Sequence, residues 1–320
     1  MNDTTILLVG HGSRETAGND EVERFTHTWR ARHPQWRTEL CFIEFAEVEV
    51  EAGLARAAQG ASRVIVVPLI LNAAGHVKME IPGHIARARL QWPRVRFDYA
   101  PHLGVCDPIL TILRRQLRGC MQDLDMPDPT TTGVILLGRG SSDRQANGEM
   151  ARMARWLFEE TDHELVDLAF TGITYPRLER AVQRQVLLGM KQIVVLPYYL
   201  FTGTLIQRIA RQVNHLKQQY PQLRFAQGSY FGFEPEIDAL LAERVQALVD
   251  GSLAGVQIGE EALHWQPHRH DGHDHHAHGH AHGHEHHHDH PHGHDHDHGH
   301  GHAHDHGHGH HHHGHGEVRA

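Results

Sequence analysis

Short apolar runs alternate with longer amphipathic stretches over the first 250 residues, and this alternation predicts the secondary structure. The apolar runs are rich in Val, Ile and Leu, which is typical of parallel strands buried on both faces. We expect strands at 5–9, 40–45, 63–69, 95–99, 134–137, 165–170, 192–198 and 223–226. Helical periodicity lies between them, at 19–32, 48–59, 79–91, 107–121, 145–160, 177–188, 205–220 and 234–250. The pattern therefore predicts an α/β protein with parallel sheets covered by helices.

The same pattern occurs twice in the chain. Gly10-His11-Gly12-Ser13 corresponds to Gly138-Arg139-Gly140-Ser141, and Asn19 corresponds to Asn147. A repeat of this length indicates two similar domains rather than a solenoid of short units. We predict two four-stranded parallel sheets flanked by helices, with an active-site cleft between the domains.

The composition of successive segments predicts the domain boundaries. We expect a first domain at 1–126 that carries the metal site, and a linker at 127–132 in a stretch rich in Asp, Pro and Thr. A second domain at 133–258 is a degenerate copy of the first, and 259–320 forms a disordered, histidine-rich, metal-binding tail.

The tail distorts the average composition of the chain. It holds 28 of the 36 histidines between His264 and Ala320, and without this segment the net charge is −3 rather than −9. A body with so little charge has no electrostatic footprint for nucleic acid. No apolar run approaches 18 residues, so we expect no membrane span.

The amino-terminal residues and the cysteines indicate a cytoplasmic protein. The first residues lack the basic and apolar regions of a secretory signal and are instead predicted to form the first strand. Cys41, Cys106 and Cys120 form no CxxC pair, which argues against a disulfide framework, a cysteine-only zinc site and a four-cysteine iron–sulfur cluster.

Three polar residues follow three neighbouring predicted strands of the first half: His11, Glu44 and His76. Ligands bind beyond the carboxyl ends of parallel strands, so these side chains are expected at one edge of the first sheet. Two imidazoles and a carboxylate suit a divalent first-row metal with positions left open for a substrate. A phosphate at the GHGS turn is the alternative, which is weaker because no second basic group or nucleophile accompanies it.

The second half keeps the scaffold but replaces every candidate ligand. Arg139, Gly172 and Thr204 stand at the positions of His11, Glu44 and His76. The metal chemistry is therefore assigned to the first domain. Arg139 is either a substrate-carboxylate contact or a solvated surface residue.

The chain resembles the class II chelatases of the sirohydrochlorin cobaltochelatase type, often called CbiX. The resemblance covers about residues 1–250, and its most specific parts are GHGSR with Asn19 and the P-x₆-GH-x₃-EIP stretch from Pro68 to Pro82. It implies insertion of Co²⁺ into sirohydrochlorin in the oxygen-independent route to cobalamin. His11 and His76 match the metal-binding and catalytic histidines of the family, and Glu44 matches an acidic site residue of related ferrochelatases. The CxxC-containing iron–sulfur motif of some long members is missing here, so we expect no cluster.

The expected reaction assigns roles to these residues. Neutral imidazole binds Co²⁺ and also accepts a proton near neutral pH, and Glu44 orients a histidine, balances charge or relays a proton. Ser13, Arg14 and Arg139 are expected to bind the tetrapyrrole, whose carboxylates need donors. Insertion of Fe²⁺ or Ni²⁺ on the same scaffold remains an alternative, as does a storage protein or metallochaperone without enzymatic activity.

The predicted tail consists largely of His-Gly, His-Asp and His-Ala pairs. Its high density of imidazoles suits Ni²⁺, Co²⁺, Cu²⁺ and Zn²⁺ with little selectivity. We expect the tail to store metal or to deliver it to the active site. Its first predicted ligands are His268, His270, His273, His275, His276, His278, His280, His282 and His284.

Overall fold

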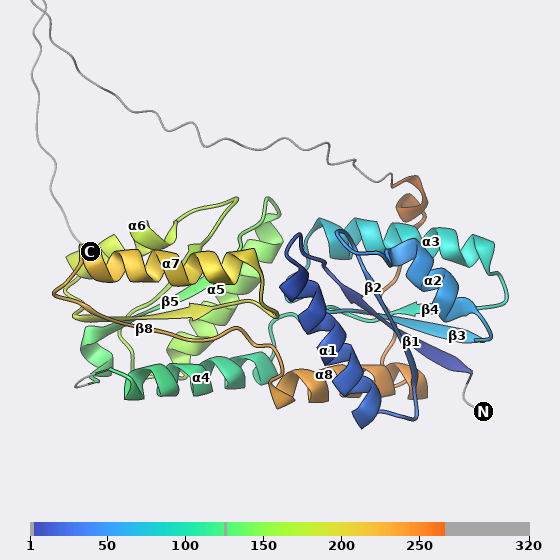
Figure 1. Ribbon diagram of the computed structural model, residues 1–320, viewed down its shortest axis with the longest axis horizontal. Helices are drawn as coiled ribbons and strands as arrows, with labels where there is room; N and C mark the ends of the chain where they lie inside the picture. The colour runs from blue at the N-terminus through green and yellow to red at the C-terminus, as the bar shows by residue number, and fades with distance from the viewer. Residues whose placement is uncertain (1–2, 125–126, 266–320) are drawn as a thin grey trace, which may run out of the picture. The chain divides into compact units, whose positions relative to one another are not determined.

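The computed structural model describes residues 3–124 and 127–265, and within them the chain forms two four-stranded parallel sheets (Figure 1). The strand order is β2-β1-β3-β4 in the first sheet and β6-β5-β7-β8 in the second. The strands are β1 (Thr4–Gly10), β2 (Arg37–Phe42), β3 (Arg63–Pro68), β4 (Arg96–Tyr99), β5 (Thr132–Gly138), β6 (Val166–Phe170), β7 (Gln192–Pro197) and β8 (Arg224–Gln227). The predicted fold class, two α/β domains with a parallel sheet each, is confirmed.

Helices separate the strands at each predicted place. They are α1 (Thr16–Arg32), α2 (Val50–Ala58), α3 (Ile81–Gln91), α4 (Asp107–Gln122), α5 (Arg144–Glu159), α6 (Leu178–Leu187), α7 (Thr204–Gln219) and α8 (Pro235–Asp250). Three short turns add to them: the π-helical η1 (His76–Glu80) and the 3₁₀ turns η2 (Pro129–Thr131) and η3 (Glu260–His264). No helix in the described ranges is both long and apolar enough to cross a membrane.

Strand β1 of the first sheet and strand β5 of the second are buried on both faces, which explains their continuous apolar runs. Ile6 and Leu8 of β1 face one core, whereas Leu7 and Val9 face another beneath α2 and α3. The core that contains Ile6 and Leu8 continues below the second sheet and includes side chains of α1, α4, α5 and α8. A continuous apolar layer therefore joins the two halves.

The last helix of each half packs against the sheet of the other half. Helix α4, which follows β4, contacts β7 and β8, whereas α8, which follows β8, contacts β3 (Figure 1). Arg63 of β3 donates hydrogen bonds to the carbonyls of Leu248 at 2.7 Å and Val249 at 3.3 Å. The predicted boundaries at 126 and 133 therefore divide the chain into its two sequence repeats. They do not divide it into two separate packing units, because each repeat packs its last helix on the sheet of the other.

Most element boundaries differ from the sequence prediction by a few residues, and two differences bear on the site and on the end of the fold. Strand β2 ends at Phe42 rather than at residue 45, because the chain turns there and the Glu44 N–H donates to the His11 carbonyl at 3.2 Å. The folded body also extends past 259. Residues 260–264 form η3, and Ala262 is only 3% exposed.

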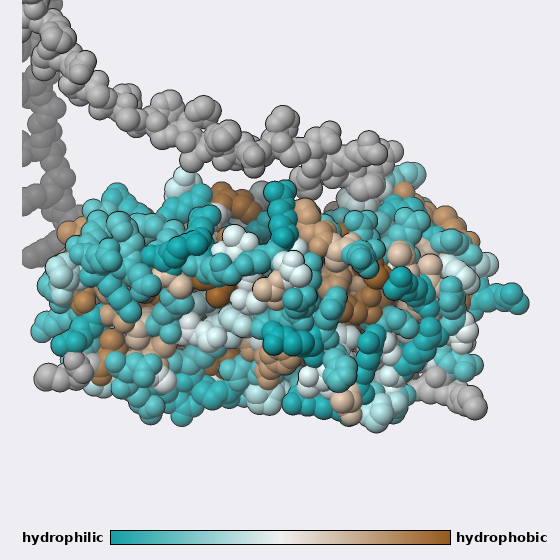
Figure 2. Space-filling model, viewed as in Figure 1, coloured by the Kyte–Doolittle hydropathy of each residue, from teal (hydrophilic) through white to brown (hydrophobic). Residues whose placement is uncertain are grey.

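The surface in view is mostly hydrophilic, with single apolar side chains scattered across it (Figure 2). Cys41, Cys106 and Cys120 are all free thiols.

Candidate metal centre

The first candidate ligand, His11, follows β1 in a loop that only glycine can complete. Gly12 has φ +90°, and a Cβ atom there would lie 1.7 Å from the Glu44 carbonyl oxygen. This close approach brings the His11 loop against the Glu44 loop. The His11 Nδ1 atom lies 3.1 Å from the Gly12 carbonyl, to which it donates in the tautomer that leaves Nε2 with its lone pair.

Asn19 holds the two loops together from the first turns of α1. Its Oδ1 atom accepts from the Ser13 N–H at 2.9 Å, and its Nδ2 donates to the carbonyls of Ser13 at 3.1 Å and Phe45 at 2.9 Å. Asn147 makes the matching bond to the Ser141 N–H in the second half, also at 2.9 Å. The asparagine that occurs in both halves, Asn19 and Asn147, therefore stabilises the loop after the first strand of its half by hydrogen bonds.

His76 lies at the start of the π-helical turn η1, just before α3. The Ile81 N–H bonds to the His76 carbonyl in the wide spacing of a π-turn, a feature that often occurs at functional sites. The His76 Nδ1 atom is hydrogen-bonded to the Glu80 carboxylate one turn later. Glu80 therefore orients the ring and leaves Nε2 available.

The structure brings together the three predicted ligands. The His11 and His76 rings meet edge to face, with centroids 4.8 Å apart, and Glu44 Oε1 lies 3.7 Å from His11 Nδ1. Ligand atoms of His11, Glu44 and His76 all lie within 4.8 Å of one another. With metal–ligand bonds of ~2.1 Å, two ligands of one tetrahedral ion lie about 3.4 Å apart, so the side chains must close in by about 1 Å to form a three-ligand site.

The surroundings of His11 favour its neutral form. Burial, the neighbouring His76 ring and the Arg139 guanidinium lower the pKa of His11 from 6.5 to about 4. A neutral imidazole is the form that binds a metal or accepts a proton. At neutral pH His11 is therefore ready for either role.

Arg139 of the second half reaches into this site. Its Nη1 lies 3.3 Å from His11 Nε2, where the guanidinium donates to the ring. Arg139 is therefore an exposed side chain that contacts one of the candidate ligands. Thr204, at the position equivalent to His76, instead donates to Glu15 at 3.3 Å.

Ser13 and Arg14 stand beside the centre, in the loop that follows His11. The Ser13 hydroxyl accepts from the Glu15 N–H at 3.1 Å, which is a local loop bond. The Arg14 guanidinium lies 5.0 Å from the centre of the Phe45 ring. A role for either residue in substrate binding remains a prediction.

Several residues that frame the centre were not predicted from the sequence. Glu80 is one, although its position four residues after His76 is a signal that helical spacing provides. Lys78 pairs with Asp143 and donates to Gln145 at 2.7 Å, and His102 lies 3.3 Å from Glu149. These contacts join the two halves around the centre, so no pattern within one half reveals them.

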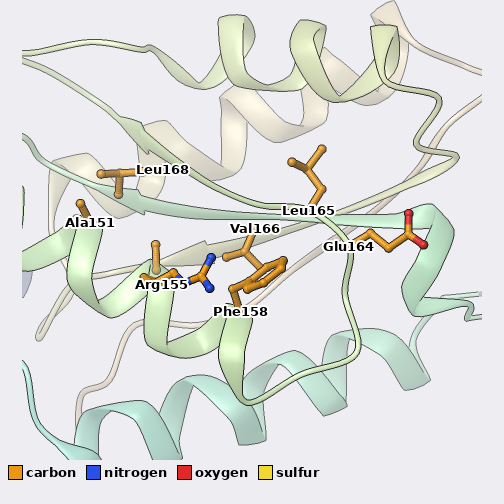
Figure 3. Close-up of a pocket in the computed structure, with 8 residues that line it drawn as sticks. Ala151, Arg155, Phe158, Glu164, Leu165, Val166 and Leu168 are labelled. Atoms are coloured by element: carbon orange, nitrogen blue, oxygen red, sulfur yellow. The ribbon is translucent and has the colours of Figure 1, made fainter. Parts of the chain in front are cut away.

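A different hollow lies on the second half, away from the candidate ligands. Its volume is about 320 Å³, and it lies between α5 and the edge strand β6, lined by Phe158, Leu165 and Leu168 with Arg155 and Glu164 (Figure 3). Arg155 is already paired with Glu159. Its lining holds no set of metal-ligating side chains, so His11, Glu44 and His76 remain the candidate ligands.

The tail histidines predicted from His268 onward lie outside the described residues. The last described residue, Trp265, packs on α3. Its ring lies 5.6 Å from that of His84, and its carbonyl accepts from Arg87 at 3.2 Å. The chain thus leaves the folded body on the helix that directly follows His76.

Comparisons with known proteins match both halves of the chain. The CbiX family profile matches residues 5–120 and 133–248, one match in each half. The sirohydrochlorin cobaltochelatase of Priestia megaterium is 38% identical over 252 residues, which are 78% of this chain and 81% of that protein. The sirohydrochlorin ferrochelatase of Bacillus subtilis is 32% identical over 245 residues, which are 75% of this chain and 90% of that protein.

A solved structure supports the same relationship. The sirohydrochlorin chelatase SirB from Bacillus subtilis subspecies spizizenii, in complex with cobalt, superposes with a TM-score of 0.64. It is 28% identical, and the match covers 78% of this chain and 96% of that one.

Proposed function

Because the chain belongs to the CbiX family, we propose that it is a sirohydrochlorin chelatase that inserts Co²⁺ into the macrocycle. One observation carries this proposal: His11, Glu44 and His76 converge in the first half, and the second half lacks every one of them. A three-ligand site with open positions suits an ion that must be handed on to a substrate. The metal is here a substrate and is not a resident cofactor.

Metallation exchanges two pyrrole protons of the macrocycle for one divalent ion. The ion is bound at the site formed by His11, His76 and Glu44, and the pyrrole N–H protons pass to a basic group of the same site. Neutral His11 suits either task because its pKa is about 4, and Glu80 holds the His76 ring in one orientation. Which histidine binds the metal and which accepts protons is left open.

The second half is assigned to substrate binding. Arg139 lies at the edge of the metal centre and carries a permanent positive charge, which suits a carboxylate of the tetrapyrrole. Arg14 and the Ser13 loop are the corresponding candidates in the first half. This division explains why the scaffold is repeated but the ligands are not.

Cobalt is our choice of metal, with iron or nickel as the alternative. The relatives include both a cobaltochelatase and a ferrochelatase, and an N/O ligand set does not by itself select among these ions. The cobaltochelatase is the more similar of the two, at 38% against 32% identity. The reaction then belongs to the oxygen-independent route to cobalamin, in the cytoplasm.

We assign the histidine-rich tail to metal delivery, with storage as the alternative. The packing of Trp265 on α3 supports delivery, because it starts the tail on the element next to His76. In general, a short flexible linker gives roughly millimolar effective concentrations at a site within its reach.

An anaerobic metallation assay tests the proposed function. Purified protein is mixed with metal-free sirohydrochlorin and Co²⁺, Fe²⁺ or Ni²⁺ in parallel, and absorbance follows the product. We expect insertion of Co²⁺ to be the fastest, and a sample without protein serves as the control for the non-enzymatic rate. No acceleration over that control with any of the metals would contradict the chelatase assignment and favour a storage protein.

A further inference from the structure

Two large apolar side chains are exposed at matched positions of the two halves. Phe45 directly follows Glu44, and Ile173 directly follows the equivalent Gly172. Phe45 is 42% exposed and Ile173 is 55% exposed. A single exposed apolar residue needs no explanation, but a pair at equivalent positions of a repeat does.

Both residues are held in a strained backbone conformation. Phe45 has φ +58° and Ile173 has φ +62°, and among the residues 3–124 and 127–265 no other residue except glycine has a positive φ. This conformation is unfavourable for a bulky side chain and most unfavourable for a β-branched one. Strain of this kind persists where the surroundings enforce it, and it concentrates at functional sites.

Specific hydrogen bonds enforce the two conformations. The Phe45 carbonyl accepts from Asn19, the clamp of the His11 loop, at 2.9 Å. In the second half the Thr174 N–H bonds to the Gly172 carbonyl at 2.6 Å, which closes a tight three-residue turn around Ile173. Each half thus uses its own loop to project one apolar side chain into solvent.

The two residues flank the metal centre from opposite halves. Phe45 adjoins Glu44, a member of the ligand set. On the other side, the Gly172 N–H bonds to the Arg139 carbonyl at 3.0 Å, and the Arg139 guanidinium lies 3.3 Å from His11. A continuous series of contacts therefore runs from Ile173 through the metal ligands to Phe45.

In each of the two loops a guanidinium lies over an aromatic ring. Arg14 lies 5.0 Å from the centre of the Phe45 ring. Arg177 lies 4.5 Å from the ring centre of Tyr175, two residues beyond Ile173. Apolar surface beside positive charge matches a flat ligand with an apolar ring and anionic substituents.

We propose that Phe45 and Ile173 contact the ring of the tetrapyrrole from the two halves, and that Arg14 and Arg177 bind carboxylates at its rim. This inference rests on the proposed chelatase function and adds the residues that hold the macrocycle over the metal. The strained loops then serve to present apolar side chains that a relaxed loop would turn away from the substrate.

Substitution by asparagine tests the proposal, because asparagine tolerates a positive φ while it removes the apolar surface. The variants are Phe45→Asn and Ile173→Asn. Leu90→Asn is the matched control, since Leu90 is 72% exposed and lies in the last turn of α3, away from the ligands. Fluorescence quenching measures binding of metal-free sirohydrochlorin, and the absorption of protein-bound Co²⁺ measures binding of the metal alone.

We expect each test variant to bind the tetrapyrrole roughly tenfold more weakly, which is the loss expected for one apolar contact. Binding of Co²⁺ and the thermal midpoint are expected to stay at wild-type values or, for the midpoint, to rise. Phe45→Leu should keep most of the affinity, and Leu90→Asn should keep all of it.

Two results separate the possible failures. Wild-type tetrapyrrole affinity in both asparagine variants would overturn the ring contacts, as would a lowered thermal midpoint with unchanged affinity, which indicates a purely structural role. A wild-type protein that neither binds nor metallates sirohydrochlorin would instead overturn the proposed function, and the ring contacts with it.

Discussion

The rings of His11 and His76 are neighbours in the candidate metal centre, but different contacts fix their orientations. The His11 ring is oriented by its own loop and by Arg139, whereas the His76 ring is oriented by Glu80 within one helical turn. Both side chains come from loops or turns at strand ends and not from the apolar core. Removing either imidazole is therefore expected to affect chemistry more than folding.

The first prediction concerns these two imidazoles. His11→Ala and His76→Ala should each lower the rate of metallation by ~10²–10⁴-fold, the loss typical of a missing general base. The thermal midpoint should change little, which calorimetry measures on the same samples. Near-wild-type metallation by either variant at saturating Co²⁺ would remove that histidine from the mechanism.

The pKa of His11 supplies the second prediction. Because its pKa of about 4 lies below the usual 6.5, the unfolded chain binds this proton more tightly than the folded one. The stability that His11 contributes is therefore complete above pH 6.5 and is lost as the pH falls toward 4. Proton NMR of the ring should show a midpoint near 4.

Arg139→Gln provides the control for that titration. The guanidinium lowers the pKa of His11, so its removal should raise the midpoint toward that of an ordinary histidine. An unchanged midpoint would show that burial and His76 account for the whole shift.

At the scale of the elements, the loops that follow the strands fix the positions of the candidate ligands. Gly12 is required because its neighbour across the loop is backbone, which cannot move as a flexible side chain does. Gly60, in the turn before β3, offers a useful contrast. It has φ +71°, but a Cβ atom there would meet nothing within 4 Å.

The third prediction compares these two glycines. Gly60→Ala should lower stability by ~1–2 kcal/mol through the left-handed conformation alone. Gly12→Ala should lower it further and weaken Co²⁺ binding, since the added Cβ atom pushes the Glu44 loop away from His11. Thermal denaturation and Co²⁺ titration measure the two effects. Equal loss of stability in both variants, with Co²⁺ affinity retained, would contradict the loop contact as the reason for Gly12.

At the scale of the whole molecule, the folded body ends later than the composition indicates. Ala262 is buried, and a Cβ atom at Gly83 of α3 would lie 3.0 Å from the Trp265 ring, so this segment is closely packed. A cut after Gly259 therefore removes part of the described fold, whereas a cut after Trp265 leaves every described residue in place.

The fourth prediction uses this difference. A chain ending at 265 should keep the full thermal midpoint, whereas a chain ending at 259 should melt several degrees lower, because ~1 kcal/mol corresponds to about 2–4 °C in a protein of this size. With abundant Co²⁺ the chain ending at 265 should metallate sirohydrochlorin at the full-length rate.

Limiting Co²⁺, or a competing chelator, should reveal the role of the tail. The chain ending at 265 is then expected to be slower than the full-length protein, and the difference should shrink as the pH falls through about 6.5, where ordinary histidines become protonated. Equal rates at limiting Co²⁺ and about pH 7.5 would refute delivery and leave storage as the role of the tail.

The sequence by itself determined both sheets and the repeat, and it placed the three candidate ligands at strand ends, because strand burial and the placing of polar residues at strand ends are local patterns. Only the tertiary structure decided the exchange of α4 and α8, since an amphipathic helix has the same pattern whichever sheet it covers. The contact of Arg139 with His11 depends on how the halves meet, and the positive φ of Phe45 and Ile173 depends on hydrogen bonds from elsewhere in the fold. These contacts depend on packing between segments that are far apart in the chain, and a local sequence pattern contains no information about such packing.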